Sequence, residues 1–506
     1  METTPKMSQR PTGHGTHVAG TILGRDTGDE KSILGVAPEA KMFAYRVLGA
    51  GGAGTWDAIL AGLEQATYDK PDIINMSLGA NCNTPVCLLS LAVNNIMLAY
   101  DDIVFMIAAG NNGPEGYTIG SPATSTMAIA VASTDKIDDA TDGLLNQISR
   151  FSSRGPVSQS FEIKPNITAN GSYVFSAVPL WSTDIIKGIP NNKYSGAYAY
   201  KKGTSMAAPH ASGAAALLIE YSRRNTGKAW DAKTIKARMM NTATPIEDSV
   251  FSAGAGYLDV YAAAHSDTVV YVTQDKVPTQ IGILYEQQKY METDIGSFNF
   301  GGHFTTSNTT AIEKMLSARI VNQGDSERNY TLDYGFTNNP DNSASITFND
   351  KSISVKPGSE TDFTTSLTMK EDCEYGIYEG FVYVRDTNSN TLVAALPFAF
   401  VTERLMPPKI VKTLMHVGTA GQHYEAEIQS ECNAPPLTNW QIESGYLPPG
   451  LVLERGHNWG MDASGEHKNA CAVINGVPSE TGSFTFTVRA ENEAGYDIRD
   501  LTIIIR

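Results

Sequence analysis

The sequence predicts an α/β domain with a mainly parallel sheet covered by helices on both faces, followed by two all-β sandwich domains. Up to about residue 264, short β-branched apolar runs alternate with longer Ala-rich stretches, an order typical of parallel sheets. Near residue 265 the helical periodicity stops, and alternating segments separated by Asn, Gly, Asp and Pro begin. A proline-containing break, MPPK at 406–409, divides this second half.

The first half supplies the elements of the sheet and its helices. Strands are expected at 42–48 (MFAYRVL), 72–78 (DIINMSL), 103–109 (IVFMIAA) and 127–133 (MAIAVAS). Helices are expected at 56–68, at 88–100 and over the Ala-rich run ASGAAALLIEY at 211–221. Ligands of such sheets bind at the carboxyl ends of the strands. Residues that directly follow the strands are therefore the first candidates for a functional site.

The second half alternates as half-buried strands do. Clear examples are SARIVNQ (317–323), YTLDYGF (330–336), EGFVYVRD (379–386), EAEIQS (425–430) and FTFTVRAEN (484–492). Several short strands with turn signals between them indicate sandwiches. Together with the length of 506 residues, this predicts three domains, at 1–264, 265–403 and 404–506.

Composition excludes several classes of protein. The formal net charge of −16 argues against a nucleic-acid partner, which needs a basic face. No apolar run of about 18 residues is present, so no membrane span is expected. The five cysteines form no paired CxxC set, and we expect no zinc site. Two pairs are candidates for disulfides, Cys82 with Cys87 and Cys432 with Cys471, and spacing alone does not fix the pairing.

Three segments contain residues suited to acyl-transfer chemistry. They are GHGTHVAG at 13–20, AAGNNG at 108–113 and GTSMAAPH at 203–210. Taken singly, each has a structural reading: a packed histidine, an Asn-Gly turn and a serine N-cap. Taken together, they provide a general base, an amide donor for an oxyanion and a nucleophile at the start of a helix.

These motifs, with INMSLG at 74–79 and FSSRGP at 151–156 in the same order, resemble the subtilisin-like serine peptidases over residues 13–264. The resemblance implies that His14 is the general base and Ser205 the nucleophile. It also implies that Asn111 donates its side-chain amide to the oxyanion, together with the backbone N–H of Ser205. His17 is similar to the structural histidine of the family.

The same resemblance implies a set of substrate contacts. Ser77-Leu78-Gly79 is similar to the strand that pairs with a bound peptide, and recognition through the main chain should be broad. Gly120 lies where the family has the floor of the pocket for the residue before the scissile bond, and a glycine there leaves room for a large apolar side chain. The remaining expected substrate-binding residues are Gly52, Ala53 and Gly54 on the opposite wall, and Ala108, Ala109 and Gly110 beside the oxyanion site.

The catalytic aspartate departs from the family pattern. The family has it in a short Asp-Thr-Gly or Asp-Ser-Gly motif before the histidine, whereas only 13 residues precede His14 and none is Asp. We therefore expect the first domain to be incomplete at its N-terminus. Asp26-Thr27-Gly28 has the right letters but follows the histidine, and we interpret it as coincidence. No cofactor is expected, although Asp26, Asp29 and Glu30 carry oxygen ligands suited to a calcium loop.

The second half resembles accessory domains found behind such peptidases. Residues 265–403 resemble a fibronectin-type sandwich, and 404–506 a bacterial-type immunoglobulin-like domain. Their default role is spacing or attachment, including attachment to a cell-surface ligand, and fold analogy says no more. The leading interpretation is a secreted or cell-surface serine endopeptidase acting on polypeptides. The alternatives are a catalytically impaired short form that binds peptides or surfaces, and an adhesin built on the two sandwiches.

Overall fold

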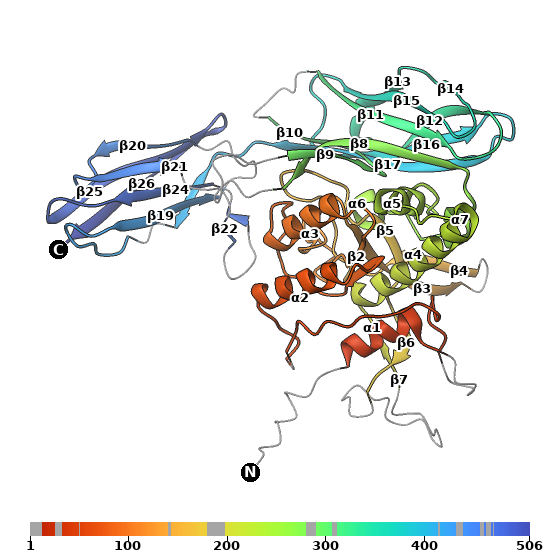
Figure 1. The fold of residues 1–506 in the computed structure, drawn as a ribbon. Coiled ribbons are helices and arrows are strands. Elements are labelled where there is room, and N and C mark those ends of the chain that lie inside the picture. Colours follow the sequence, from red (N-terminus) through yellow and green to blue (C-terminus); the bar gives the residue numbers. More distant parts are fainter. Residues whose placement is uncertain are drawn as a thin grey trace, which may run out of the picture.

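The structure, a computed structural model, consists of an α/β part and two β-sandwiches (Figure 1). It describes residues 13–25, 33–49, 51–139, 143–179, 198–279, 290–305, 311–412, 415–431, 439–455, 460–461, 467–468 and 470–506.

The α/β part is built on a five-stranded sheet that is mostly parallel. Its strands are β1 (Ile73–Met76), β2 (Val104–Ala108), β3 (Ile129–Asp139), β4 (Gly143–Ile148) and β5 (Ile167–Asn170). The pairs β1–β2, β2–β3 and β3–β5 are parallel, and β4 runs antiparallel to β3. A separate antiparallel hairpin joins β6 (Val174–Ala177) to β7 (Tyr198–Lys201).

Helices cover the sheet, and β2 is buried along its whole length. The helices are α1 (His14–Leu23), α2 (Trp56–Tyr68), α3 (Leu88–Ala99), α4 (Thr204–Thr226), α5 (Ala232–Asn241), α6 (Val250–Ala253) and α7 (Val260–His265). The long helix α4 crosses the sheet and contacts β1, β2, β3 and β5. Small residues of α4 allow this close approach: its Ala207, Ala211 and Ala214 are almost completely buried.

Most of the predicted elements of the first half are confirmed, but the strand expected at 42–48 is wrong. That segment follows an irregular path, and Met42 and Phe43 are 49% and 59% exposed. A β-strand needs a neighbour to complete its hydrogen bonds. Among the described strands β1 has only β2 as a partner, and 42–48 pairs with none. The strand propensity of residues 42–48 is therefore not enough to make them a strand.

The first sandwich, β8 to β17, contains two five-stranded sheets, ordered β10-β17-β16-β12-β14 and β13-β15-β11-β8-β9. Its strands are β8 (Thr268–Pro278), β9 (Tyr290–Ile295), β10 (Phe298–Thr305), β11 (Ile312–Asn322), β12 (Arg328–Asn338), β13 (Ala344–Phe348), β14 (Ser352–Val355), β15 (Glu360–Met369), β16 (Gly376–Asp386) and β17 (Leu392–Arg404). Alternate residues of β15 point into the core, as the sequence pattern predicts.

The second sandwich, β18 to β26, has sheets ordered β18-β19-β24-β21 and β20-β25-β26 beside the short pair β22–β23. Its strands are β18 (Lys409–Lys412), β19 (Tyr424–Glu431), β20 (Asn439–Gly445), β21 (Leu451–Arg455), β22 (Gly460–Met461), β23 (His467–Lys468), β24 (Ala470–Gly476), β25 (Gly482–Asn492) and β26 (Gly495–Ile505). It has a hydrophobic core of its own, which includes Ile428, Phe486 and Ile503.

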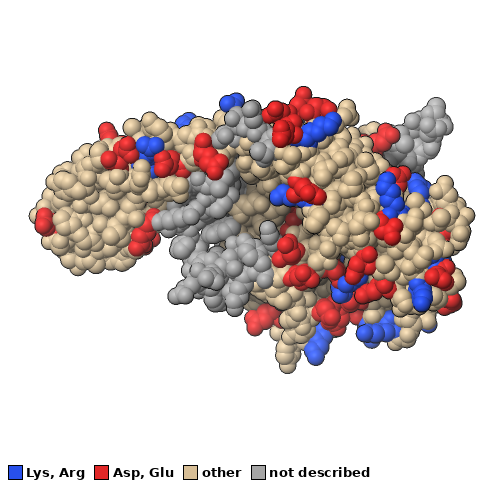
Figure 2. Space-filling view, turned by 90° about the horizontal axis from the view of Figure 1, so that it is seen from above, with Lys and Arg blue, Asp and Glu red and all other residues tan. Residues whose placement is uncertain are grey.

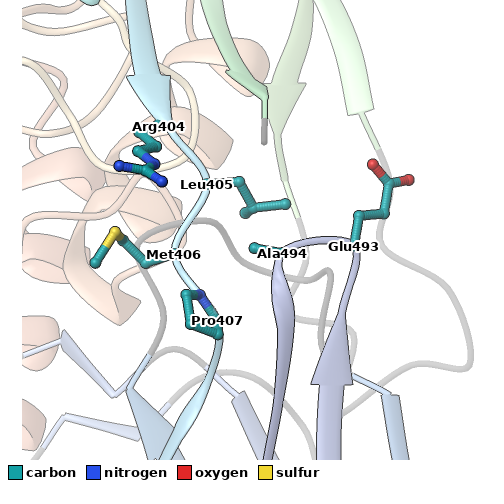
Figure 3. A pocket seen from close by; sticks show the side chains of 6 residues that line it. All are labelled: Arg404, Leu405, Met406, Pro407, Glu493 and Ala494. Carbon is teal, nitrogen blue, oxygen red and sulfur yellow. The ribbon is translucent and has the colours of Figure 1, made fainter. Parts of the chain in front are cut away.

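The first sandwich shares a hydrophobic cluster with the α/β part. Phe161, Ile163 and Phe251 pack there with Phe381 and Val401. The two sandwiches meet at a narrower junction, where residues 404–407 and 493–494 line a cavity of about 250 Å³ (Figure 3). The α/β part and the first sandwich therefore share a core, whereas the second sandwich is joined by a short connection.

One of the two predicted disulfides is present, between Cys82 and Cys87. Cys432 lies outside the described residues, so its pairing with Cys471 stays a prediction. Cys373 is buried and takes no part in this disulfide. A search of the described residues finds no helix both long and apolar enough to cross a membrane.

Candidate active site

His14 and Ser205 stand at the starts of two packed helices. His14 is the first residue of α1, and Ser205 is the second residue of α4. Val18, one turn along α1, shares a buried cluster with Met206, the residue after Ser205. The two helices that carry the predicted base and nucleophile therefore pack against each other (Figure 1).

Asn111 follows β2 and is held by the residue before the serine. Its Oδ1 accepts hydrogen bonds from the backbone N–H and the hydroxyl of Thr204, at 2.9 and 3.1 Å. Because both donors engage the oxygen, the amide nitrogen of Asn111 is directed to the other side. Gly203 has φ 147°, a backbone conformation that favours glycine, directly before this contact.

Ser205 is linked to the segment that follows β1. The hydroxyl of Ser77 donates to the backbone carbonyl of Ser205 at 2.9 Å, and the Ser205 hydroxyl donates to the Ser77 carbonyl at 3.4 Å. The first N–H groups of a helix have no partner within the helix, so that of Ser205 suits an oxyanion. Ser205 thus adjoins Ser77, and the residue before it adjoins Asn111, as the predicted roles of these residues require.

The environment of His14 favours its neutral form. Burial lowers the pKa of His14, and the positive charge of Lys201 lowers it further. A neutral imidazole can accept a proton, which is the task of a general base. A neighbouring carboxylate would act in the opposite direction and raise the pKa, and none contributes to the pKa of His14 among the described residues.

His17 holds α1 against the hairpin of β6 and β7. It is fully buried, and its Nε2 lies 3.0 Å from the carbonyl oxygen of Val174 and 3.1 Å from that of Ala199. Burial is the main cause that lowers the pKa of His17 to about 4. The ring is therefore neutral at pH 7 and serves to fix the helix that begins with His14.

Three of the expected substrate segments are connected to one another by backbone hydrogen bonds. Ala80, next to Gly79, exchanges two backbone hydrogen bonds of 2.9 Å with Ser121, next to Gly120. The Gly120 N–H donates to the carbonyl of Ala109 at 3.0 Å. The remaining members of these segments are Ser77 and Leu78 after β1, and Ala108 and Gly110 at the end of β2.

Gly120 is buried, and space there is limited on one side. A Cβ at this position would stand 2.8 Å from the carbonyl oxygen of Ala80. The glycine is thus needed for the close approach of two chain segments, a reason that the sequence pattern did not reveal.

Gly52, Ala53 and Gly54 form an exposed turn of their own. The N–H of Gly49 donates to the Ala53 carbonyl at 2.8 Å, and the N–H of Gly52 donates to the Gly49 carbonyl at 3.0 Å. Because the preceding segment is not a strand, this turn does not continue a sheet edge as expected. Its place as the second wall of a peptide site stays a prediction.

Residues important to the site's geometry were not assigned a role from sequence. Thr204 fixes Asn111, and Ser153 accepts a hydrogen bond from the Asn112 N–H at 3.1 Å. Asn81 accepts from the Asn112 side chain at 2.5 Å. Thr204 could have been found from its place directly before the nucleophile, whereas the partners of Asn112 are distant in sequence.

The described residues contain no group of three or more His, Cys, Asp or Glu side chains arranged to hold a metal ion. The calcium ligands considered above, Asp26, Asp29 and Glu30, lie outside these residues.

The chain is similar in sequence to known proteins. The "Minor extracellular protease Vpr" of Bacillus subtilis (strain 168) is 26% identical over 84% of this chain. The chain spans 63% of the length of that relative. "Subtilisin DY" of Bacillus licheniformis is 38% identical, over 50% of this chain and 77% of its own.

Among solved structures, the "Prenylagaramide maturation protease PagA" is 25% identical and covers 52% of this chain and 84% of its own, with a TM-score of 0.38. A family model described as an Fn3-like domain matches residues 293–399, within the first sandwich. The model of the subtilase family, Peptidase_S8, matches residues 2–258, slightly more than half of the 506 residues, and the chain belongs to this family.

Proposed function

We propose that the chain acts as a serine endopeptidase that cleaves polypeptides through an acyl-enzyme, with Ser205 as nucleophile, His14 as general base and Asn111 as oxyanion donor. The observation that supports this most strongly is the contact between Thr204 and Asn111. It fixes an amide donor beside the residue at the start of α4, where an oxyanion donor is needed.

In this mechanism the Ser205 oxygen attacks the carbonyl carbon of the scissile bond, and its proton passes to the His14 imidazole. The negative charge forms on the substrate oxygen, facing the Asn111 amide and the Ser205 N–H. The C–N bond then breaks, and the imidazolium returns its proton to the leaving amine. Water attacks the acyl group by the same route in reverse, which regenerates the Ser205 hydroxyl.

A second candidate function follows from the surroundings of His14. In a triad the carboxylate fixes the imidazole tautomer and stabilises the imidazolium, and its loss lowers turnover by about 10⁴-fold in serine peptidases. Because no described carboxylate affects the pKa of His14, the described part alone fits a peptide-binding form that acylates slowly. Both functions use the same substrate site.

We propose peptide recognition along Ser77, Leu78 and Gly79, with Gly52, Ala53 and Gly54 on the opposite wall. In this proposal Ala108, Ala109 and Gly110 complete the floor of the cleft, and the pocket at Gly120 accepts large apolar residues before the scissile bond. One relative is named as extracellular, and we propose that this chain also acts outside the cell. The acyl-transfer mechanism proposed above uses only groups of the chain itself, and we propose no cofactor for it.

The test is covalent labelling of the chain by a serine-directed fluorophosphonate. Labelling should occur in the unchanged protein and disappear in Ser205→Ala, because the reagent needs the activated hydroxyl. His210→Gln is a matched control, since His210 bonds to the Met206 carbonyl of its own helix at 2.8 Å and should leave labelling intact. Labelling that persists in Ser205→Ala contradicts the assignment of the nucleophile.

A further inference from the structure

A loop of the candidate site is attached to the first sandwich. Residues 110–119 leave the sheet at Ala109 and return at Gly120, whose N–H donates to the Ala109 carbonyl at 3.0 Å. The loop contains Asn111 at one end and leads into the proposed substrate pocket at the other. Its shape therefore affects the oxyanion site and the pocket together.

Tyr117 connects this loop to the sandwich. Its hydroxyl donates to Glu403 Oε1, near the end of β17, at 2.5 Å. Burial and then the hydrogen bond to Glu403 raise the pKa of Tyr117, so the phenol stays protonated and acts as the donor. Its ring packs against the hydrophobic cluster that the sandwich shares with the α/β part.

The backbone of Tyr117 indicates that these contacts determine the loop's conformation. Its φ of 59° lies in the left-handed region, which is sterically unfavourable for a non-glycine residue. Such conformations persist only where surrounding contacts enforce them. For Tyr117 the enforcing side-chain contacts come from Glu403 and the shared cluster.

A neighbouring loop is held by the same sandwich in the same way. Phe161 also has a left-handed backbone, with φ 53°, and its ring centre lies 5.5 Å from that of Phe304. A Cβ at Gly302 of the sandwich would stand 2.6 Å from the Phe161 ring. The absence of a side chain at Gly302 therefore leaves the space that this ring occupies. The Ile163 N–H donates to Asn299 of the sandwich at 2.9 Å.

Backbone hydrogen bonds connect Tyr117 with the oxyanion end of the loop. The N–H groups of Tyr117 and Thr118 donate to the carbonyls of Gly155 and Arg154, at 3.1 and 2.9 Å. In the same segment, 153–155, the Ser153 N–H donates to the Gly110 carbonyl at 3.0 Å. A displacement of Tyr117 would therefore act on a segment that also supports the residue before Asn111.

We propose that Tyr117 and Glu403 are positioning residues through which the first sandwich sets the shape of the substrate pocket. The specificity for the residue before the scissile bond then depends on a domain that contributes no catalytic group. This inference rests on the proposed function and adds a specificity role for the sandwich.

The matched control is a second glutamate between the same two parts of the chain. Glu379 Oε2 accepts hydrogen bonds from the Ser249 hydroxyl at 2.8 Å and the Val250 N–H at 3.1 Å. Neither partner belongs to the 110–119 loop. Glu379→Gln therefore changes an interdomain contact while leaving the tether of the loop in place.

The experiment compares Tyr117→Phe, Glu403→Ala, the double variant, Glu403→Gln and Glu379→Gln in the full chain. Its first readout is hydrogen–deuterium exchange over 110–119, which needs no catalysis. We expect faster exchange in Tyr117→Phe and Glu403→Ala, partial recovery in Glu403→Gln, whose amide oxygen still accepts, and no change in Glu379→Gln. Unchanged exchange in the first two variants overturns the inference.

The second readout is peptide cleavage. For a peptide with Phe before the scissile bond, Tyr117→Phe and Glu403→Ala should each lower kcat/KM about fivefold, the scale of one lost hydrogen bond, mainly through KM. A peptide with Ala at that position should respond by less than about twofold, and the double variant should be no worse than Glu403→Ala, since the two residues share one contact. Equal losses for both peptides contradict a role in the pocket.

The two proposals fail separately. If the unchanged chain shows no Ser205-dependent labelling, the proposed function is wrong, while hydrogen–deuterium exchange still decides whether the sandwich holds the loop. If labelling is normal in every variant but neither exchange nor peptide preference responds to Tyr117→Phe and Glu403→Ala, the inference is wrong and the proposed function stands.

Discussion

Thr204 illustrates how a residue without a reactive group can determine catalytic geometry. Two of its groups donate to the Asn111 oxygen, and its hydroxyl also lies 3.2 Å from both the carbonyl oxygen and the N–H of Gly110. It is fully buried. Its side chain thus connects the loop after β2 with the start of α4, the two segments that carry the proposed oxyanion donors.

We predict that Thr204→Val lowers kcat of the proposed peptidase about tenfold with little change in KM, because a misplaced amide weakens only the transition state. The backbone N–H that holds Asn111 remains, so the loss should be smaller than the roughly 10²–10³-fold known for removing a subtilisin's oxyanion asparagine. Steady-state kinetics of both proteins measure this. Thr204→Ser keeps the hydroxyl and should retain activity; an equal loss there would contradict the role given to the hydrogen bond.

Among the elements, α1 and α4 are joined through the segment that follows α1. The N–H groups of Val36 and Ala37 donate to carbonyls of α1 at 3.1 and 2.7 Å. Val36 also lies against Gly213 of α4, where an added Cβ would stand 2.5 Å from the Val36 Cβ. The absence of a side chain at Gly213 is therefore what allows Val36, and the segment bonded to α1, to pack closely against α4.

We predict that Gly213→Ala lowers the free energy of unfolding by about 1–3 kcal/mol through this overlap, although alanine favours helices. Denaturant unfolding followed by circular dichroism measures the change. Gly15→Ala is the matched substitution in α1, where a Cβ meets nothing within 4 Å. Gly15→Ala should leave stability unchanged or raise it by up to about 1 kcal/mol. A gain in stability in Gly213→Ala would contradict the prediction, because it would show that the segment containing Val36 moves away from the added methyl group.

At the scale of the whole molecule, we propose the division into 1–264, 265–403 and 404–506. The first boundary falls at the last residue of α7, just before β8, and the second at the last residue of β17. Acidic and basic side chains are interspersed over the face in Figure 2, without a continuous basic surface there. For the last domain we propose attachment, including to a cell-surface ligand.

We predict that residues 404–506 fold alone, whereas residues 265–403 lose stability when separated from the α/β part. The second sandwich has its own core, but the first shares a buried cluster with Phe161 and Phe251. Thermal unfolding of the two excised pieces, compared with the full chain, tests this contrast. A coil-like circular dichroism spectrum of 404–506, or equal stability of 265–403 with and without its neighbour, would contradict the division.

The sequence by itself determined the fold class, most elements and the identity of the candidate catalytic groups. Periodicity of 56–68 and 88–100 predicted α2 and α3 almost to the residue, because amphipathic pattern is a local property of a helix. The motifs around His14, Asn111 and Ser205 predicted acyl-transfer chemistry, since these residue types have few other common uses when they occur together.

The tertiary structure alone decided how those groups are supported. The segment 42–48 has the composition of a strand but lacks a paired neighbour, and ladder formation depends on chain segments distant in sequence. In the same way, the contact between Tyr117 and Glu403 spans 286 residues of sequence. No local pattern encodes such a contact, because it exists only where two separately folded surfaces meet and exclude water between them.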